Sequence, residues 1–313
     1  MRKFLITGGA GFLGLHTIDA LLKRGAKVRV LDNFMCSSKH ALDPIRKKIE
    51  FIRGDVRDPR AVKEAVRNVE VVFHFAAIRS VVKTVEDPLV AHQVNSTGAL
   101  LLLEYSKQAG ARHFVFTSTS AVYGASAAPF QKEEAPLKPM SPYGVAKLAA
   151  ENYARYYFFE KKFPTTSVRI FNVYGPRQNP ESKYSLAVPG ILSKIRRGER
   201  PGIDGTGEQT RDFVYISDVL DALFKIVGNP KAYGKVYNLG SGQAVSINRI
   251  AQTLLKLTGS NLKSLHGPRR PGDPERTCAD ITKIRKELGW TPKVSLEEGL
   301  KKVVAWPAGG KNQ

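Results

Sequence analysis

The chain has 313 residues, enough for one large or two modest domains with well-buried cores. Its 49 lysines and arginines against 28 acidic residues give a formal charge of +21, but these basic residues are dispersed, which favours a solvated surface that attracts anionic substrates over specific nucleic-acid recognition. No apolar stretch approaches the ~18 residues of a membrane span, and the two cysteines, Cys36 and Cys278, have no metal-type spacing, so neither a membrane partner, a disulfide framework nor a metal site is expected.

The start of the chain admits two interpretations. Two basic residues before an apolar run are typical of a secretory signal, yet four glycines interrupt that run. The favoured interpretation is a buried strand from Phe4, a glycine-rich turn that opens a helix over 12–24, and a second strand that ends at Asp32, 18 residues after Gly14. Glycine lets the backbone approach a pyrophosphate, and the carboxylate accepts hydrogen bonds from a ribose. We therefore predict a dinucleotide site in a cytoplasmic protein.

Strand and helix patterns alternate through the N-terminal half, which predicts a parallel sheet covered on both faces. Further strands are expected at 49–52, 69–75, 112–117 and 166–171, and further helices at 59–67, 88–109 and 143–162. Six strands in this rhythm make an α/β fold with a doubly wound (Rossmann) sheet, whose ligand lies beyond the carboxyl ends of the strands.

The rhythm breaks after Phe171 into a loop rich in proline and glycine, a predicted helix near 186–198 and a glycine cluster at 202–207. We therefore predict a dinucleotide-binding domain over 1–172. A smaller α+β substrate-binding region over 173–313 would follow it, with the chain returning to the first domain around 212–228.

Tyr143 and Lys147 lie four residues apart just inside a predicted helix, so both project from one face. A nearby ammonium favours the phenolate and lowers the pKa of the phenol, which makes a tyrosine a usable base near neutral pH. Thr119, in a hydroxyl cluster after a buried strand, lies 24 residues before Tyr143. His74 and His113 fall within apolar strands and are interpreted as core residues. The pattern predicts an active site that contains Thr119, Tyr143 and Lys147.

Further motifs accompany the glycine turn Thr7-Gly-Gly-Ala-Gly-Phe-Leu-Gly14. They are Leu-Asp32-Asn33, Gly-Asp55-Val56, His-Phe75-Ala-Ala77, Val-Asn95, Tyr143-x-x-x-Lys147, Phe171-Asn172-Val-Tyr-Gly-Pro-Arg, Gln-Thr-Arg211-Asp-Phe-Val and Arg270-Pro-Gly-Asp273. With these motifs, over nearly its whole length, the chain resembles the extended short-chain dehydrogenases/reductases. Within them it is similar to the nucleotide-sugar 4-epimerases of the UDP-glucose and UDP-N-acetylglucosamine type.

The resemblance implies NAD as cofactor and a UDP-sugar as substrate, and a carboxylate at Asp32 repels the 2′-phosphate of NADP. The residues implied to bind NAD are Gly8, Gly11, Phe12, Leu13, Asp32, Asn33, Asp55, Val56, Phe75, Ala76, Ala77, Arg79, Asn95, Tyr143, Lys147 and Phe171. Those implied to bind the nucleotide sugar are Thr119, Tyr143, Asn172, Arg211, Arg270, Asp273 and Thr277. The implied catalytic residues are Thr119, Tyr143 and Lys147.

The implied reaction is a 4-epimerisation of UDP-glucose and UDP-galactose. Tyr143 takes the proton of the C4 hydroxyl while the C4 hydride passes to NAD, and the 4-keto sugar turns before the hydride returns. Ala121 stands where relatives that eliminate water carry a glutamate, which favours epimerisation over dehydration. A UDP-glucuronate 4-epimerase, a reductase that releases NAD(H), and a non-catalytic NAD- or RNA-binding protein are the alternatives.

Two further expectations come from the resemblance. Thr277 stands where family members restricted to glucose and galactose carry a bulky tyrosine, and the loop from Gly175 is similar to that of epimerases of N-acetylated sugars, so the site is expected to admit the N-acetylated pair as well. One face each of the helices at 88–109 and 143–162 is expected to stay uncovered by the sheet. In the resembling family such helices form a four-helix homodimer interface, so a homodimer is predicted.

Overall fold

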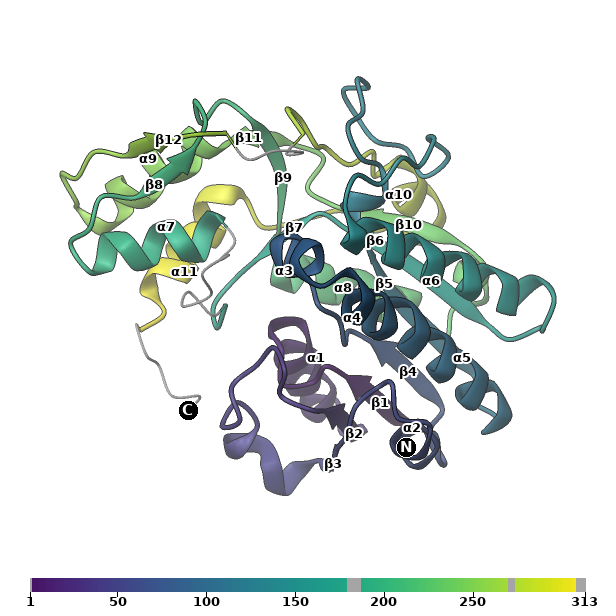
Figure 1. Ribbon diagram of the computed structural model, residues 1–313. Helices are drawn as coiled ribbons and strands as arrows, with labels where there is room; N and C mark the ends of the chain where they lie inside the picture. The colour runs from purple at the N-terminus through teal and green to yellow at the C-terminus, as the bar shows by residue number, and fades with distance from the viewer. Residues whose placement is uncertain (1, 179–186, 270–273, 308–313) are drawn as a thin grey trace.

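The computed structural model describes residues 2–178, 187–269 and 274–307. Its main sheet is a seven-stranded parallel sheet in the order β10-β6-β5-β4-β1-β2-β3 (Figure 1). The strands are β1 (Lys3–Thr7), β2 (Lys27–Asp32), β3 (Glu50–Arg53), β4 (Val71–His74), β5 (His113–Thr119), β6 (Thr165–Ile170) and β10 (Val236–Leu239). The doubly wound α/β fold predicted from the sequence is confirmed. The six expected strands are present, and β10 adds a seventh beyond β6.

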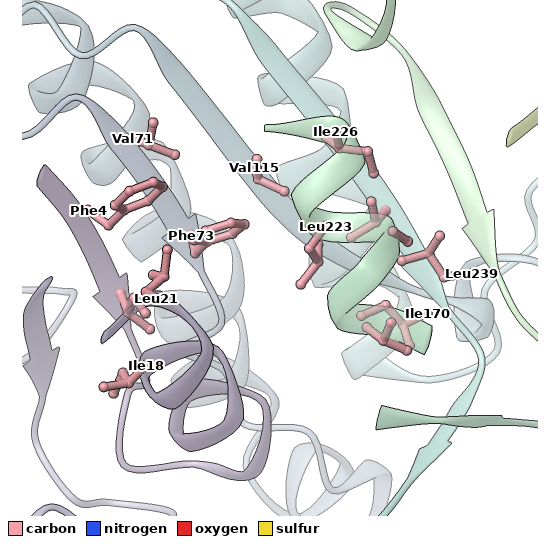
Figure 2. Close-up of a cluster of buried hydrophobic side chains, with 14 of the residues drawn as sticks. Phe4, Ile18, Leu21, Val71, Phe73, Val115, Ile170, Leu223, Ile226 and Leu239 are labelled. Atoms are coloured by element: carbon pink, nitrogen blue, oxygen red, sulfur yellow. The ribbon is translucent and has the colours of Figure 1, made fainter. Parts of the chain in front are cut away.

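Helices cover both faces of this sheet because its strands are apolar on both sides. α1 (Phe12–Lys23) and α8 (Ile216–Ile226) cover one face. Figure 2 shows their side chains against those of the strands, with Ile18, Leu21, Leu223 and Ile226 beside Phe73 and Val115. The other face is covered by α2 (Pro59–Val66), α5 (Gly98–Gln108) and α6 (Pro142–Phe159).

α3 (Val81–Glu86), which was not predicted, comes before α4 (Pro88–His92). The helix expected at 88–109 is confirmed as one helical run from α4 through a π-helical turn over Gln93–Thr97 to α5. Asp87 separates the first two helices, since its carboxylate accepts a hydrogen bond of 3.0 Å from the N–H of Val90 and begins a new helix ahead of Pro88.

The C-terminal part builds a second, smaller core. Its strands form a three-stranded sheet, β11-β9-β7, and a pair, β12-β8. The elements are β7 (Asn172–Tyr174), α7 (Ala187–Arg196), β8 (Gly202–Asp204), β9 (Thr210–Tyr215), β11 (Ala244–Ser246), α9 (Ile247–Thr258), β12 (Leu265–Gly267) and α11 (Leu296–Ala305). α10 (Thr282–Leu288) packs on β10 of the main sheet instead. Short 3-10 turns lie at Asp43–Lys48, Ser120–Val122 and Pro230–Ala232. Between the β7 and β11 strands the chain supplies α8 and β10 to the main sheet (Figure 1).

No helix among the described residues is both long and apolar enough to span a bilayer. His74 and His113 are buried in strands of the main sheet, as predicted. His113 accepts a hydrogen bond of 3.1 Å at Nδ1 from the N–H of Gly228, and its Nε2 lies 3.0 Å from the hydroxyl of Thr166, which itself donates to the carbonyl of Ala232. These bonds require a neutral ring with its proton on Nε2, and they tie the segment after α8 to the sheet.

The neutral His113 predicts acid sensitivity of the fold. Burial lowers its pKa from 6.5 to about 3, so between these values the unfolded chain binds a proton that the folded chain does not. The stability contribution is complete above pH 6.5 and is lost by about 1.4 kcal/mol per pH unit as the pH falls. His113→Gln, which keeps a donor and an acceptor but cannot titrate, should flatten this dependence in chemical unfolding followed by circular dichroism. Equal slopes in both proteins between pH 6.5 and 4.5 would contradict the assignment.

Candidate active site

A cleft of about 1610 Å³ runs along the carboxyl ends of the main strands. The structure brings nearly all of the predicted site residues to its walls. They are Gly8, Gly11, Phe12, Leu13, Asp32, Asn33, Asp55, Val56, Phe75, Ala76, Ala77, Arg79, Thr119, Tyr143, Lys147, Phe171, Asn172, Arg211 and Thr277. Arg270 and Asp273 lie outside the described residues, and so does most of the loop after Gln178.

Asn95 is buried and does not line the cleft. Its amide accepts a hydrogen bond of 2.8 Å from the N–H of Ile78 and donates one of 2.9 Å to the carbonyl of the same residue. The π-helical turn that carries Asn95 gives the amide this position. Asn95 therefore affects the cleft only indirectly, by holding the backbone of Ile78 between Ala77 and Arg79, which line it.

The glycine turn fits a dinucleotide. Gly8 has φ +69°, and a Cβ there would lie 2.7 Å from the backbone nitrogen of Ala76. Both the backbone conformation and the close contact therefore require glycine at this position. A Cβ on Gly14 would lie 2.5 Å from the carbonyl oxygen of Gly8. α1 starts after Gly11 without a side-chain cap, which leaves its first N–H groups for an anion in the cleft.

The carboxylates at the ends of β2 and β3 organise the opposite end of the cleft. Asp32 accepts hydrogen bonds from the N–H groups of Ala10 at 2.9 Å and Phe34 at 2.7 Å, while burial raises the pKa of its carboxyl. The amide of Asn33 donates to Asp55 at 2.7 Å. Asp32 thus ties the glycine turn to β2 and borders the space where a ribose bound at that turn would lie.

Thr119 and Tyr143 come together from two different elements. Thr119 ends β5, and Tyr143 lies in the first turn of α6, which Ser141 caps by accepting 3.1 Å from the N–H of Gly144. Both residues line the cleft. Burial raises the pKa of Tyr143, whereas the Thr119 hydrogen bond and the positive charge of Arg79 lower it.

The expectation that Lys147 lowers the pKa of Tyr143 stays a prediction. Lys147 is 2% exposed, with its ammonium 4.3 Å above the ring of Phe116. Burial lowers its pKa to about 7, and the negative charge of Glu151 counteracts that. A buried ammonium of this kind changes its charge readily near neutral pH.

Three hydroxyls on the cleft walls point to a missing polar ligand. Thr117, Ser118 and Thr277 are buried, line the cleft and have no hydrogen-bond partner within the described part of the chain. Buried hydroxyls are nearly always paired, so these three are candidates to bond a polar ligand in the cleft. The close approach at Gly8 and the uncapped start of α1 fit a bound dinucleotide.

The carboxylates of the cleft are confined to one end. Among the described residues that line it, the acidic ones are Asp32 at the end of β2 and Asp43 and Asp55 on the segments that follow β2 and β3. Ala121 lines the cleft in the turn after Thr119, at the other end. Beside Thr119 and Tyr143 the described walls therefore offer hydroxyls, an amide and cations, and no carboxylate.

The second region closes the cleft from its far side. Arg211 on β9 and Asn172 on β7 line it, and the amide of Asn172 donates 3.3 Å to the backbone carbonyl of Asp212. Arg177 also lines the cleft and pairs with Asp19 of α1 at 2.6 Å. No role for it was predicted from the sequence. Its φ of +69°, rare for a residue with a side chain, is the sign of a constrained position and has no sequence signal.

α3 is the other part of the wall that the sequence analysis missed. Ser80, Val81, Val82 and Val85 contribute to the lining. Ser80 caps the helix by accepting 3.3 Å from the N–H of Lys83, so a serine before an apolar pair was the available signal.

Comparisons with known proteins agree with this architecture. The model of the GDP-mannose 4,6-dehydratase family matches residues 5–303. A putative UDP-glucose 4-epimerase of Methanocaldococcus jannaschii is 34% identical over 96% of this chain and 97% of its own length. The chain therefore belongs to this family of extended short-chain dehydrogenases/reductases, as the motifs had indicated.

Two solved structures illustrate the range of the family. UDP-glucose 4-epimerase of Thermotoga maritima, solved with UDP-glucose, is 35% identical with a TM-score of 0.93, covering 97% of this chain and 98% of its own. DesIV of Streptomyces venezuelae, a dTDP-glucose 4,6-dehydratase with NAD bound, is 29% identical with a TM-score of 0.91, covering 97% and 96%. Epimerases and dehydratases thus share this fold, and the side chains at the sugar end must distinguish them.

The glycine turn generates a prediction with a matched control. Gly8→Ala forces a side chain into φ +69° and into the backbone at Ala76, whereas Gly25→Ala meets a similar φ, +71°, with nothing within 4 Å. Both should lose about 1 kcal/mol to backbone conformation. Only Gly8→Ala should also lose dinucleotide binding, measured by calorimetry. Equal dinucleotide affinity in the two variants would show that the close approach at Gly8 does not build the site.

Proposed function

We propose that this NAD-dependent enzyme is a 4-epimerase of UDP-hexoses, which interconverts UDP-glucose and UDP-galactose and also accepts the N-acetylated pair. The proposal rests on the side chains that line the cleft around Thr119 and Tyr143, where the sugar would bind. Tyr143 and Thr119 form an alcohol-binding pair there, and Ala121 stands beside them where elimination of water would need an additional acid or base. With these groups alone the site removes a hydride and returns it.

The residues of the chain divide the work as follows. Bound NAD supplies the acceptor for the C4 hydride and a positive charge that lowers the pKa of a neighbouring phenol. Thr119 holds the C4 oxygen against Tyr143, which takes the hydroxyl proton and later gives it back. Lys147, on the same helix as Tyr143, carries a positive charge when it is protonated. Because its pKa is about 7, the charge of a bound ligand can change its protonation.

Substrate recognition falls to the second region. Arg211 and Asn172, which line the cleft, would hold the uridine diphosphate, since a guanidinium suits a pyrophosphate and an amide suits a uracil edge. Arg270 and Asp273, in the motif beyond the described residues, are proposed for the same task. With the pyrophosphate held there, the keto sugar turns about it and presents its other face.

The central role of Tyr143 can be tested by removing one hydroxyl. Tyr143→Phe should keep the fold and the bound NAD but convert UDP-galactose ~10²–10⁴-fold more slowly, the usual effect of losing a general acid–base group. Tyr157→Phe is the control, because that phenol lies on the same helix and bonds Glu104 instead. Turnover should be followed without added cofactor. A Tyr143→Phe variant with more than about a tenth of wild-type activity would exclude this base.

The acceptance of N-acetylated sugars is predicted from Thr277, a small residue in the cleft wall whose hydroxyl is unpaired within the described structure. Thr277→Tyr should remove activity on UDP-N-acetylgalactosamine and spare UDP-galactose, because the added ring overlaps the space of the C2 substituent. Thr277→Ser should retain both activities. A wild type that converts UDP-galactose but not UDP-N-acetylgalactosamine at saturation would contradict the prediction.

The homodimer expected from the helices at 88–109 and 143–162 is proposed from the apolar residues that α4 and α6 expose. These large exposed residues are Leu89, Val145, Tyr153, Tyr156 and Phe159. The exposed residues of α6 recur at helical spacing and so form an apolar stripe. Two copies of the chain can bury this surface against each other. Leu89→Asp, at a residue 76% exposed, should give a monomer by light scattering, whereas Leu265→Asp on β12 should not. A wild-type protein that stays monomeric at all concentrations would contradict the proposal.

A further inference from the structure

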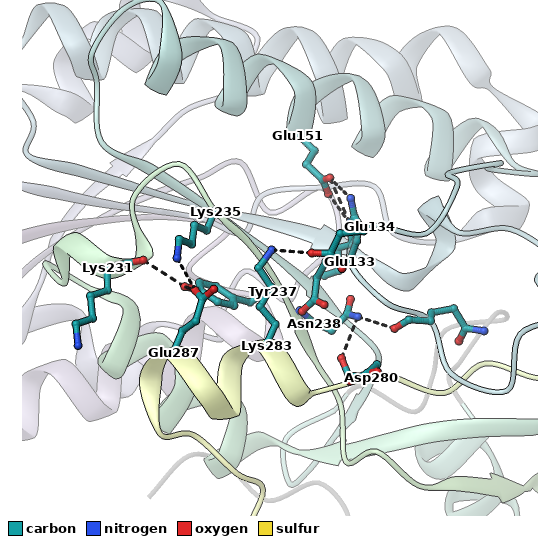
Figure 3. A network of polar contacts seen from close by, with 12 residues as sticks. Glu133, Glu134, Glu151, Lys231, Lys235, Tyr237, Asn238, Asp280, Lys283 and Glu287 are labelled. Atoms are coloured by element: carbon teal, nitrogen blue, oxygen red, sulfur yellow. Dashed lines mark hydrogen bonds and ion pairs between the residues drawn. The ribbon is translucent and has the colours of Figure 1, made fainter.

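A chain of buried polar contacts lies beneath the cleft and leads from the catalytic helix to the segment that carries Thr277. Figure 3 shows Glu151, Glu133, Asn238 and Asp280 converging from α6, a loop, β10 and the segment before α10. Buried polar groups are costly to leave unpaired, so such a chain holds its members in a defined arrangement.

Arg169 of β6 is the first link. Its guanidinium is 3% exposed and binds the carboxylate of Glu151 through Nε and Nη2, with distances of 2.5 to 3.2 Å. Glu151 lies one helical turn beyond Lys147 and two turns beyond Tyr143. The remaining nitrogen, Nη1, donates 2.9 Å to the hydroxyl of Tyr123 and 2.9 Å to the carbonyl of Glu133. Arg169 therefore joins the catalytic helix to the segment that follows Thr119.

Tyr123 continues the chain toward the second region. Its hydroxyl, which accepts from Arg169, donates 2.7 Å to the amide oxygen of Asn238. The Tyr123 ring lies 6.3 Å from that of Phe171, which lines the cleft. Burial raises the pKa of Tyr123 to about 12, so the phenol keeps the proton that it donates.

Asn238 then holds the segment after Thr277. Its amide nitrogen donates 2.8 Å to the carbonyl of Gln131 and 3.2 Å to that of Asp280. Gln131 in turn clamps Cys278 from both sides, because its side-chain oxygen accepts 2.7 Å from the Cys278 N–H and its own N–H donates 2.8 Å to the Cys278 carbonyl. Thr277, next in sequence to Cys278, is thus positioned by contacts that begin at the catalytic helix.

We propose that Tyr123 is a positioning residue, whose hydroxyl keeps the sugar-facing segment around Thr277 in register with Thr119 and Tyr143. The inference rests on the proposed epimerase function. The phenol sits where the two halves of the network meet, and both halves end at the cleft. Glu133 makes a second link, with its carbonyl on Arg169 and its carboxylate accepting 2.8 Å from the N–H of Asn238, so the fold does not depend on the Tyr123 hydroxyl alone.

Tyr123→Phe removes this one oxygen and leaves the ring on Phe171. The matched control is Tyr237→Phe, since Tyr237 is the neighbour of Asn238 on β10, is buried, and donates 2.6 Å to Glu287 away from the network. Tyr123→Phe loses two buried hydrogen bonds and Tyr237→Phe loses the one to Glu287, so Tyr123→Phe should melt lower, and both variants are assayed well below their melting temperatures. Only Tyr123→Phe should lower kcat on UDP-galactose, by about 10- to 100-fold, while NAD content and affinity for UDP alone stay unchanged. Gln131→Leu, which releases Cys278 at the far end, should lower kcat in the same way.

Two results would overturn the proposal. One is a kcat of Tyr123→Phe no lower than that of Tyr237→Phe. The other is a loss of affinity for UDP alone as large as the loss for UDP-galactose. A wild type that binds UDP-sugars but epimerises none would contradict the proposed function instead. In that case the role of Tyr123 is decided by measured affinities. Tyr123→Phe must then bind UDP-galactose more weakly than the wild type does and bind UDP alone equally well.

Discussion

The cleft depends on one constraint, the parallel register of the central strands. Thr7 pairs with His74 and His74 with Phe116, so β1 and β4 end level, whereas β5 and β6 run three residues further to the pair Thr119 and Ile170. The glycine turn after β1 therefore meets the backbone at Ala76 after β4, and Thr119 projects beyond them. The chemistry of the site is a consequence of that edge, because the side chains that follow the strands are brought together by topology.

The buried ion pair of Arg169 and Glu151 has an electrostatic cost. Burying Arg169 and Glu151 removes two charges from water, and their mutual attraction offsets the desolvation only because Tyr123 and the Glu133 carbonyl also pair the guanidinium. An apolar pair could stabilise the fold as well. The ionic pair instead defines the position of α6, on which Tyr143 must meet Thr119 within hydrogen-bond distance.

The features that sequence patterns predicted are those with local physical signatures. The glycine turn, the six apolar strands and the Tyr143–Lys147 spacing each follow from backbone or periodicity rules within a few neighbouring residues. β10 was missed because Val236–Leu239 is a four-residue run far along the chain, with nothing local to show that it pairs with β6. The start of the helix expected at 88–109 also had a local signal, because Asp87 caps it and Pro88 occupies its first position.

The site residues show the same division. Sequence patterns predicted which residues gather at the cleft, but not what their surroundings do to them. The pKa of Tyr143 is raised because burial outweighs the nearby hydroxyl and charge, and burial cannot be deduced from a four-residue spacing. Asn95 belongs to a recognisable motif, yet its amide is occupied by the backbone of Ile78. Tyr123 and Asn238 meet across 115 residues of sequence, so only the fold could reveal their contact.

The central claim is that the site moves a hydride from C4 and back with no loss of water. The most direct test is incubation of the protein with UDP-galactose in D₂O without added cofactor, with products resolved by NMR and mass spectrometry. The account predicts UDP-glucose of unchanged mass, with the original hydrogen retained at C4 and no deuterium bound to carbon. A product lighter by one water and carrying solvent deuterium on carbon would contradict it, because that product requires an elimination that Ala121 and its neighbours are not equipped to perform.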